Sequence, residues 1–348
     1  MTQIKNAAIL GVSGYTGAEA VRLLLSHPQI KIKALTAQRR AGRALPDLYP
    51  QFSGFDLPDV TTWQDVDWDE INVVFVALPH GASQDIVGQV AGEVETVIDL
   101  SADFRLRDPD LYMRTYGRPH TQQDLLSKAV YGLTEYARDD LRDARIVACP
   151  GCYPTCSLLS LLPAVKADML ELDSLIIDAK SGATGAGRKA SDGLIYSQLT
   201  DGAHAYDIGH HRHGPEIDQM LTSVSGQDVT VSFTPHLLPM SRGMITTTYA
   251  NLKKGLDFQD LRAVYEPRYC HEPFIYLESP GVVPQTRHIR GTNQFRLGLF
   301  EDRVPGSVII TGVLDNLVKG SSGQAIQNYN LTQGWNETLG LAAVALFP

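Results

Sequence analysis

Cys152 lies in the segment CPGCYPT at residues 149–155, between a strand-like run at 145–148 and an apolar stretch at 156–162. Pro154 has the backbone angle preferred in the first turn of a helix, so we expect Cys152 just before a helix N-terminus. There, unpaired N–H groups and the helix dipole stabilise a thiolate, the reactive form of cysteine. The segment therefore predicts a nucleophilic thiol suited to covalent catalysis.

Two other interpretations of this segment stay open at this point. A cysteine is most often a small buried hydrophobic residue, although the turn residues Pro150 and Gly151 present this thiol at a junction. Cys149 and Cys152 also form a CxxC pair at a strand-to-helix junction, as in thiol-disulfide oxidoreductases. The rest of the sequence is needed to distinguish between these interpretations of Cys152.

A histidine-rich segment, HHRHGPEI at residues 210–217, supplies candidate acid–base groups. His211 and His213 are two residues apart, and in an extended segment they point the same way. We expect His211 to act as the acid or base beside the Cys152 thiolate, with His213 and Arg212 in support. A metal site is less favoured, because carboxylate or thiolate partners at a convincing spacing are absent.

The first half of the chain begins with a pattern typical of nucleotide binding. Residues 6–12 predict a strand, GVSGYTG at 11–17 predicts a glycine turn, and residues 18–26 have helical spacing. Glycines in such a turn let the backbone approach a pyrophosphate, which the N–H groups of the helix N-terminus then hold. The expected nucleotide contacts in this turn are Gly11, Ser13, Gly14, Tyr15, Thr16 and Gly17.

The next predicted strand, at residues 30–35, ends at Thr36, where NAD-binding sites often carry an acidic residue. This chain has instead the hydroxyl of Thr36 and the cations Arg39 and Arg40, a combination suited to a 2′-phosphate. The sequence therefore predicts NADP(H) as the cofactor in preference to NAD(H).

Two further predicted strands, at 71–78 and 94–100, run into the loops PHGAS and SADFR. Loops at the carboxyl ends of parallel strands border the ligand of an open sheet. We therefore expect Pro79 and His80 to contact the cofactor, and Arg105 to contact a phosphate group.

After Cys152 the pattern changes to alternating strands separated by long polar segments, which indicates a mixed, mostly antiparallel sheet. The predicted fold class is α/β, with a Rossmann-like nucleotide-binding domain and a second, α+β domain. The predicted strands of the second domain are residues 175–179, 229–233, 244–249, 295–299 and 308–310.

The composition narrows the class of protein. The 348 residues are 43% hydrophobic and 20% charged, which is typical of a globular protein long enough for two domains. Thirty Lys and Arg against 39 Asp and Glu give a net charge of −9, which argues against general nucleic-acid binding. No apolar run is long enough to span a membrane and no signal peptide is recognisable, so we expect a cytoplasmic protein with reduced thiols.

Eight motifs together resemble the N-acetyl-γ-glutamyl-phosphate reductases of arginine biosynthesis, which are relatives of the aspartate-semialdehyde dehydrogenases. The motifs extend over almost the whole chain, from Gly11 to Gly320. The resemblance implies that Cys152 is the nucleophile, that the HRH segment supplies the catalytic histidine and that the first glycine turn binds the nucleotide. The motifs are GVSGYTGAE, ALPHGAS, DLSADFR, PGCYPT, SGATGAGRK, HRHGPEI, TPHLLPMSRG and DNLVKG.

This resemblance implies NADPH-dependent reduction of N-acetyl-γ-glutamyl phosphate to the 5-semialdehyde and inorganic phosphate, through a thioester on Cys152. Aspartyl phosphate and carrier-linked aminoadipyl phosphate are the alternative acyl-phosphate substrates. A homodimer or homotetramer built on the second domain's sheet is also implied. Further expected contacts are Gly182 and Asn316 with the cofactor, and Ser181, Arg188, Arg212, Glu216 and Arg242 with the substrate.

The same resemblance predicts that the first domain is discontinuous. We expect residues 1–151 and 314–348 to form the NADP-binding domain and residues 152–313 to form the catalytic and oligomerisation domain. One position departs from the pattern, because family members usually carry Asn where this chain has Cys149. We expect Cys149 to be able to form a disulfide with Cys152 under oxidation and to inactivate the enzyme reversibly.

Overall fold

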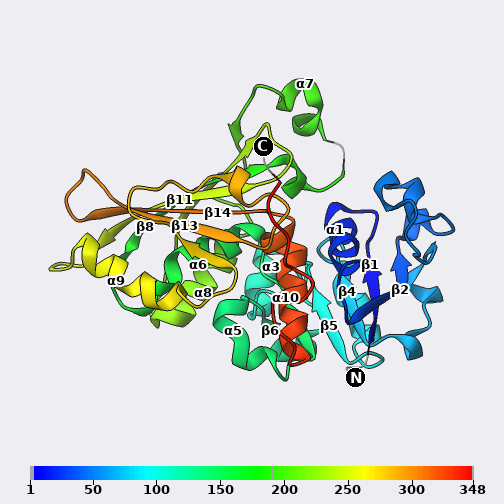
Figure 1. Cartoon of the computed structure of the whole chain (residues 1–348). Helices are drawn as coiled ribbons and strands as arrows, with labels where there is room; N and C mark the ends of the chain where they lie inside the picture. Colours follow the sequence, from blue (N-terminus) through cyan, green and yellow to red (C-terminus); the bar gives the residue numbers. More distant parts are fainter. Residues whose placement is uncertain (1–3, 190, 347–348) are drawn as a thin grey trace. The chain divides into compact units, whose positions relative to one another are not determined.

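The computed structural model describes residues 4–189 and 191–346. The contacts within the chain divide it into two compact units. Figure 1 shows the whole chain, coloured by residue number from the N-terminus to the C-terminus. The chain leaves unit 1 directly before Gly151 and returns to it after Gly320. Unit 1 consists of Met1–Pro150 and Ser321–Ala342, and unit 2 consists of Gly151–Gly320 and Ala343–Pro348.

Unit 1 is built on a seven-stranded sheet in the order β3-β2-β1-β4-β5-β7-β6, whose neighbouring strands all pair in parallel. The strands β4 and β5 are buried throughout, as expected for a parallel sheet that is covered on both faces. The Rossmann-like half of the predicted fold class is confirmed. The strands are β1 Lys5–Leu10, β2 Ile30–Thr36, β3 Val60–Thr61, β4 Val73–Val76, β5 Thr96–Asp99, β6 Val130–Tyr131 and β7 Ile146–Ala148.

The helices of unit 1 follow local sequence signals. In α3, Asp108 precedes Pro109 and accepts a hydrogen bond from the Asp110 N–H, and Gly117 ends the helix with a left-handed φ of 70°. The α-helices are α1 Tyr15–Leu24, α2 Ser83–Val90, α3 Pro109–Tyr116, α4 Gln123–Lys128, α5 Thr134–Leu141 and α10 Gly323–Thr332. Short 3-10 helices span Gln38–Arg40, Leu45–Asp47, Pro50–Phe52, Trp63–Asp65 and Trp68–Glu70.

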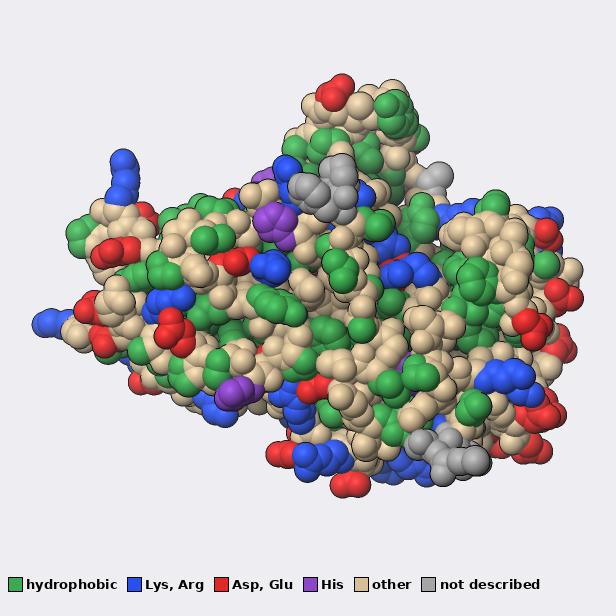
Figure 2. Space-filling model, viewed as in Figure 1, with side chains coloured by type: hydrophobic (Ala, Val, Ile, Leu, Met, Phe, Trp, Pro, Cys, Tyr) green, Lys and Arg blue, Asp and Glu red, His purple; other side chains and the backbone are tan. Residues whose placement is uncertain are grey.

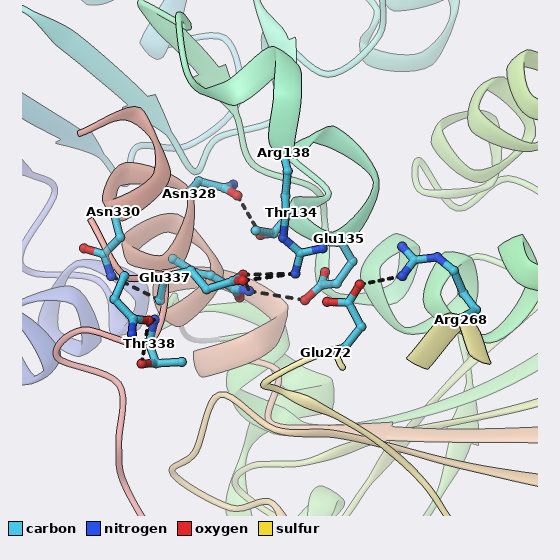
Figure 3. A network of polar contacts seen from close by, with 11 residues as sticks. Thr134, Glu135, Arg138, Arg268, Glu272, Asn328, Asn330, Glu337 and Thr338 are labelled. Carbon is cyan, nitrogen blue, oxygen red and sulfur yellow. Dashed lines mark hydrogen bonds and ion pairs between the residues drawn. The ribbon is translucent and has the colours of Figure 1, made fainter. Parts of the chain in front are cut away.

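Helix α10 joins unit 1 through buried polar side chains (Figure 3). The Asn328 amide donates to the Gly132 carbonyl at 2.7 Å and accepts from the Thr134 hydroxyl at 2.6 Å. Arg138 of α5 pairs with Glu337, which follows α10, at 3.1 Å. These bonds satisfy buried polar groups of three segments at once, so they specify where the returning chain docks within unit 1.

A buried carboxylate joins the two loops that the sequence places at the sheet edge. Asp103, in the loop after β5, accepts from the Gly81 N–H at 2.7 Å and from the Ser83 N–H at 3.2 Å and hydroxyl at 2.7 Å. The Gln84 N–H at 3.3 Å and the Tyr112 hydroxyl at 2.7 Å also donate to it. Because Ser83 and Gln84 begin α2, the carboxylate also lies where the helix dipole favours negative charge.

Unit 2 is built on a second seven-stranded sheet, in the order β12-β13-β14-β11-β8-β10-β9. Four of its neighbouring pairs are antiparallel and two, β12–β13 and β8–β10, are parallel. The predicted mixed, mostly antiparallel sheet is therefore confirmed. The strands are β8 Leu170–Gly182, β9 His204–Ala205, β10 Ser232–Leu238, β11 Met244–Leu252, β12 Ile275–Leu277, β13 Phe295–Glu301 and β14 Ser307–Leu314.

Helices pack on one face of this second sheet, as Figure 1 shows for α6, α8 and α9. Helix α6 is buried from Tyr153 to Val165, because it packs against the sheet as well as against α8 and α9. The helices of unit 2 are α6 Cys152–Lys166, α7 Tyr196–Leu199, α8 Gly214–Ser225 and α9 Phe258–Tyr269. Short 3-10 helices span Ala183–Ala186, Asp192–Leu194 and Thr286–His288, and a π-helical turn spans Val318–Ser322.

The return of the chain to unit 1 lies later than the sequence predicts. The predicted boundary is residue 314, whereas the contacts place it after Gly320. The buried Asp315 carboxylate accepts hydrogen bonds from the Gly291 N–H at 2.7 Å and the Leu317 N–H at 2.9 Å. These bonds hold the segment after β14 in unit 2.

We predict that Asp103→Asn lowers the free energy of unfolding by about 2–4 kcal/mol, because an amide cannot accept from all the donors around this buried carboxylate. Chemical denaturation of the full chain, followed by circular dichroism, measures the change. Asp139→Asn is the matched control, since the Asp139 side chain is 91% exposed and pairs only across one helical turn with Arg142. Equal unfolding midpoints for the two variants would contradict the role of Asp103.

Candidate active site

Cys152 is the first residue of helix α6, and Gly151 precedes it as the N-cap in an extended conformation. The start of a long helix is the expected environment for a thiolate, because the helix dipole favours negative charge there. Cys152 is partly exposed, whereas Cys149 and Cys156 are buried. Cys270 is exposed and ends α9. Cys152 is thus the cysteine that combines access with a helix N-terminus.

Two glycines allow close packing around Cys152. A Cβ atom on Gly151 would lie 2.5 Å from Nε2 of His213, so the His213 ring lies directly against the residue before the nucleophile. A Cβ atom on Gly320 would lie 2.8 Å from Cβ of Cys152. Neither position has room for a side chain, and both glycines therefore let neighbouring groups approach the thiol closely.

Glu216 holds the backbone of the turn before Cys152. Its side chain is fully buried in the first turn of α8, and its Oε1 accepts a hydrogen bond from the Gly151 N–H at 2.8 Å. This bond holds the turn that carries Cys152. The predicted contact of Glu216 with the substrate stays a prediction.

The histidine segment is a turn that leads into α8, not the extended run that the sequence suggested. His213 is the N-cap of α8 with helical backbone angles, and its N–H donates to Nδ1 of His211 at 3.1 Å. Both rings are nonetheless buried side by side, with their centroids 4.8 Å apart. The turn thus brings the two imidazoles together by a different geometry from the predicted one.

Burial and, to a smaller extent, the Arg212 charge lower the pKa of His211 to about 4, and Asp207 opposes the shift. His211 is therefore neutral at pH 7, and because Nδ1 accepts the His213 N–H, its proton lies on Nε2. Protonation of His211 is unfavourable in this environment, which makes it a weak base. Which of the two histidines acts as the acid or base stays a prediction.

Two tyrosines that the sequence analysis did not single out surround these imidazoles. The Tyr153 ring contacts His211 and His213 at centroid distances of 5.5 and 5.9 Å, and the Tyr206 ring contacts His211 at 5.6 Å. Phe233 of β10 packs on Tyr153 at 5.3 Å. Tyr153 directly follows Cys152, which was the one available signal for its involvement.

Loops at the ends of β8, β10 and β14 meet near this part of unit 2. Asn316 accepts from the Gly243 N–H at 3.0 Å and donates to the Thr184 hydroxyl at 2.9 Å. The Gly182 N–H donates to the Gly243 carbonyl at 2.9 Å, which closes the same junction. Asn316 and Gly182 therefore join the SGATG and PMSRG loops, and their predicted cofactor contacts stay predictions.

The predicted substrate residues of unit 2 differ in their surroundings. Ser181 is buried at the end of β8, and its side chain forms a hydrogen bond with Tyr153. Burial raises the pKa of Tyr153, and this hydrogen bond opposes the shift. Arg242 pairs with the buried Asp315 carboxylate at 3.5 Å. Arg188 and Arg212 are exposed. The structure thus brings Ser181 to the tyrosine and histidine cluster and leaves the arginine roles as predictions.

Arg105 belongs to unit 1 and is largely buried. Its guanidinium donates to the Cys149 carbonyl at 2.8 Å and to the Leu100 carbonyl at 3.0 Å. It therefore holds the end of β7 to the end of β5. A guanidinium has five donors, so these two bonds alone do not decide the predicted phosphate contact.

The glycine turn of unit 1 has the form that the sequence predicts. Gly11 has a φ of +88°, and a Cβ atom there would collide with the carbonyl oxygen of Ala77. A Cβ atom on Gly17 would collide with the Gly11 carbonyl. Gly14 is the N-cap of α1, with Tyr15 and Thr16 in its first turn. This backbone suits a nucleotide pyrophosphate at the start of α1.

The remaining predicted cofactor residues also lie at the carboxyl edge of the parallel sheet. Thr36 ends β2, and its carbonyl accepts the Gly11 N–H at 2.9 Å, while Arg39 follows in an exposed turn. Pro79 and His80 follow β4 and are exposed. The Ser13 carbonyl accepts from the Tyr49 hydroxyl at 2.8 Å, which holds the glycine turn.

The described residues were compared with two other kinds of site, a metal centre and a membrane-spanning helix. Acidic and basic side chains are interspersed on the face shown in Figure 2. Within residues 4–189 and 191–346, His, Cys, Asp and Glu side chains form no group of three or more that could hold a metal ion. In that part of the chain we also find no helix with the length and apolar character needed to cross a membrane.

Solved structures of low sequence identity share this fold. Aspartate semialdehyde dehydrogenase II from Vibrio cholerae matches with a TM-score of 0.73 and 16% identity, over 95% of this chain and 99% of that one. Aspartate semialdehyde dehydrogenase with NADP from Candida albicans matches with a TM-score of 0.68 and 16% identity, over 95% and 99%. These likenesses concern the fold alone.

Sequence comparisons are more specific. Family models for the semialdehyde dehydrogenase NAD binding domain and dimerisation domain match residues 6–144 and 152–316. The N-acetyl-gamma-glutamyl-phosphate reductase of Rhodospirillum rubrum is 50% identical over 100% of both chains, and that of Afipia carboxidovorans is 49% identical over 99% of both. A probable chloroplastic N-acetyl-gamma-glutamyl-phosphate reductase of Arabidopsis thaliana is 46% identical over 98% of this chain and 84% of that protein. The chain therefore belongs to the N-acetyl-γ-glutamyl-phosphate reductase family of the semialdehyde dehydrogenases.

Proposed function

We propose that this protein reduces N-acetyl-γ-glutamyl phosphate to N-acetyl-glutamate 5-semialdehyde and inorganic phosphate with NADPH, in arginine biosynthesis. The observation that carries the proposal is the thiol of Cys152 at the start of α6, with His213 packed against the preceding Gly151. The names of the full-length relatives support the substrate. The dinucleotide turn of unit 1 supports the cofactor class.

The chemistry requires one covalent intermediate on the protein. The Cys152 thiolate bonds to the γ-carbonyl carbon, the carbon–oxygen bond to phosphate breaks and phosphate leaves with the electron pair. The Gly11–Gly17 turn would hold NADPH, which when bound would supply the hydride that converts the thioester into a thiohemiacetal. The resulting thiohemiacetal loses its hydroxyl proton, the carbon–sulfur bond breaks and the thiolate is restored. The N–H groups in the first turn of α6 stabilise the oxyanion that forms when the thiolate adds to the carbonyl carbon. They also stabilise the oxyanion of the deprotonated thiohemiacetal.

His213 is the better candidate for the proton transfers, in a reversal of the order that the sequence suggested. Its Nε2 lies against Gly151, next to the nucleophile. His211 accepts the His213 N–H and has a pKa lowered to about 4, so we assign it a supporting role. Proton transfer by a positioned imidazole accelerates such steps by about 10²–10⁴-fold.

Basic side chains are the proposed holders of the two anionic groups of the substrate. Arg242 and Arg188 flank loops of unit 2 and are assigned to its carboxylate or phosphate, with Arg212 as an exposed neighbour of the histidines. Arg105 is assigned to the leaving phosphate. Ser181, beside Tyr153, is a further proposed substrate contact.

A homodimer or homotetramer is the proposed assembly, in the cytoplasm. The match of residues 152–316 to a dimerisation domain supports an oligomer. Ile176 and Tyr249 are direct partners across β8 and β11 and are 47% and 41% exposed in unit 2. Exposed apolar side chains on the sheet face opposite the helices are suited to burial against a second copy.

The reaction is tested in reverse, by phosphate-dependent reduction of NADP with the semialdehyde. We predict faster turnover of N-acetyl-glutamate semialdehyde than of aspartate semialdehyde or a carrier-linked aminoadipate semialdehyde. Cys152→Ser should lose at least about 10³-fold in kcat, because a hydroxyl is a much poorer nucleophile than a thiolate.

Cys270→Ser is the matched control for this loss, since Cys270 is exposed and ends a different helix. Its activity should equal that of the wild type. Activity that survives in Cys152→Ser, or that is abolished by a metal chelator, would reject the mechanism. Preference for another of the three semialdehydes would reject the substrate.

For the two histidines, we predict that His213→Asn lowers kcat by about 10²–10⁴-fold, as expected for loss of the general acid or base. His211→Asn should lower kcat by only about ten-fold, because it removes support and not the proton carrier. Steady-state kinetics at pH 7 measures both. Equal losses, or a larger loss in His211→Asn, would restore the original order of roles.

For the cofactor, we predict that Arg39→Ala lowers the ratio of kcat/KM for NADPH to that for NADH by about ten-fold or more, because a charge-assisted contact to the 2′-phosphate is lost. Arg142→Ala is the control, as Arg142 is 68% exposed and ends α5 in the same unit. An unchanged ratio in Arg39→Ala would show that Arg39 does not determine the preference for NADPH over NADH.

A further inference from the structure

Tyr153 and Tyr206 connect the two segments of unit 2 that carry the reacting groups. Tyr153 directly follows Cys152 in α6, and Tyr206 follows β9 in the segment that leads to His211. Their hydroxyl oxygens are 3.1 Å apart, so one hydroxyl donates a hydrogen bond to the other. This bond ties the start of the nucleophile's helix to the histidine segment.

The rings of the two tyrosines enclose the imidazoles edge to face. Tyr153 meets His211 at an interplanar angle of 90° and His213 at 68°, and Tyr206 meets His211 at 70°. Phe233 meets His211 at 60° and completes the enclosure from β10. Edge-to-face packing has a preferred geometry, so it orients the imidazole rings as well as burying them.

We propose that the Tyr153–Tyr206 hydroxyl pair is a positioning device, which fixes the imidazoles of His211 and His213 beside Cys152 and so sets the reactivity of the thiol. The two tyrosines are positioning residues, because they act through the histidines. The kinetic consequence rests on the proposed function, whereas the effect on the thiol rests only on the arrangement within unit 2.

Neutral hydroxyls are well suited to this task. Burial raises the pKa of Tyr206 to about 12, and the charge of a Cys152 thiolate contributes to the shift. Burial also raises the pKa of Tyr153, to which the same thiolate charge contributes. Both tyrosines therefore keep their protons around neutral pH, and the pair holds its geometry without placing a second negative charge beside the thiolate.

Several titratable or charged groups lie around the two tyrosines and two histidines, and each of them affects how the reactivity of Cys152 depends on pH. The pKa of His211 responds to burial, Arg212 and Asp207, and that of Tyr206 responds also to Cys152. The groups contributed by the surrounding elements are Cys152 and Tyr153 of α6, Tyr206, Asp207, His211 and Arg212 of the segment after β9, and His213 and Glu216 at the start of α8.

The test measures alkylation of Cys152 by iodoacetamide against pH, with the Cys152 peptide quantified by mass spectrometry in the full-length protein. In Tyr206→Phe and Tyr153→Phe, the apparent pKa of Cys152 alkylation should rise by about 0.5–1 unit, which corresponds to one lost hydrogen bond. The value of kcat should fall about five- to ten-fold in each, with KM for the cofactor unchanged.

The double variant distinguishes a pair from two separate hydroxyls. If the hydroxyls act as one unit, Tyr153→Phe with Tyr206→Phe should lose less than the sum of the two single variants, because the hydroxyl–hydroxyl bond is already absent in each of them. Tyr265→Phe is the control for general loss of a buried tyrosine hydroxyl. The Tyr265 hydroxyl donates to the backbone carbonyl of Ser160 in α6 at 2.6 Å. This variant should lose stability without a shift of the alkylation profile.

Alkylation profiles that superimpose on the wild type, effects that add in the double variant, or an equal shift in Tyr265→Phe would each overturn the proposal. The alkylation assay needs neither substrate nor cofactor. A shifted profile in a protein that fails to reduce the acyl phosphate would therefore leave the tyrosine pair standing and reject only the proposed function.

Discussion

The hydrogen bond between the Gly151 N–H and the Glu216 carboxylate is the constraint on which the catalytic geometry depends. It joins the turn before the nucleophile to the first turn of α8 at 2.8 Å, with the carboxylate fully buried. Because His213 directly precedes α8, the same bond sets the distance between the imidazole and Cys152. A side chain at residue 151 would occupy the place of the His213 ring, so glycine is required there for steric reasons and not for its backbone angles. Nucleophile and imidazole are thus held by two helix N-termini that share one carboxylate.

The same physical device recurs wherever loops of this protein must be precise. The Asp103 carboxylate accepts hydrogen bonds from the loop after β4 and from the start of α2. The Asp315 carboxylate accepts from the N–H groups of Gly291 and Leu317. A single buried acceptor with several donors is costly to leave incomplete, so each loop has one favourable arrangement. The buried Asn328 amide fixes helix α10 within unit 1 in a related way, by accepting from the Thr134 hydroxyl and donating to the Gly132 carbonyl. The precision of the loops therefore comes from buried polar groups, while the sheets supply the burial.

Patterns of local sequence predicted what local physics determines. Apolar runs predicted the parallel strands, alternation predicted the mixed sheet, and the glycine turn followed from spacing, because each depends on neighbours in the chain. The histidine segment was expected to be extended, but Pro215 and Glu216 start α8 so early that His213 becomes its N-cap. The bond between Glu216 and Gly151 was not predicted, because the two residues are 65 positions apart in the sequence. Tyr206 was missed for the same reason, since its partner Tyr153 belongs to another element. Contacts between distant segments are the part of a site that spacing does not encode.

Burial separates the two cysteines of the CPGC segment chemically. Burial raises the pKa of Cys149 to about 12, and the nearby Asp99 adds to the shift. A thiol with that pKa is a thiolate in only about one molecule in 10⁵ at pH 7. Disulfide formation needs a thiolate to attack, so Cys149 is a slow resolving partner for an oxidised Cys152 as long as β7 stays packed. Its carbonyl accepts the Arg105 guanidinium, which holds that strand end in place. Burial of Cys149 therefore disfavours the oxidative switch expected from the CxxC spacing, whereas the partly exposed Cys152 is accessible for the proposed acyl transfer.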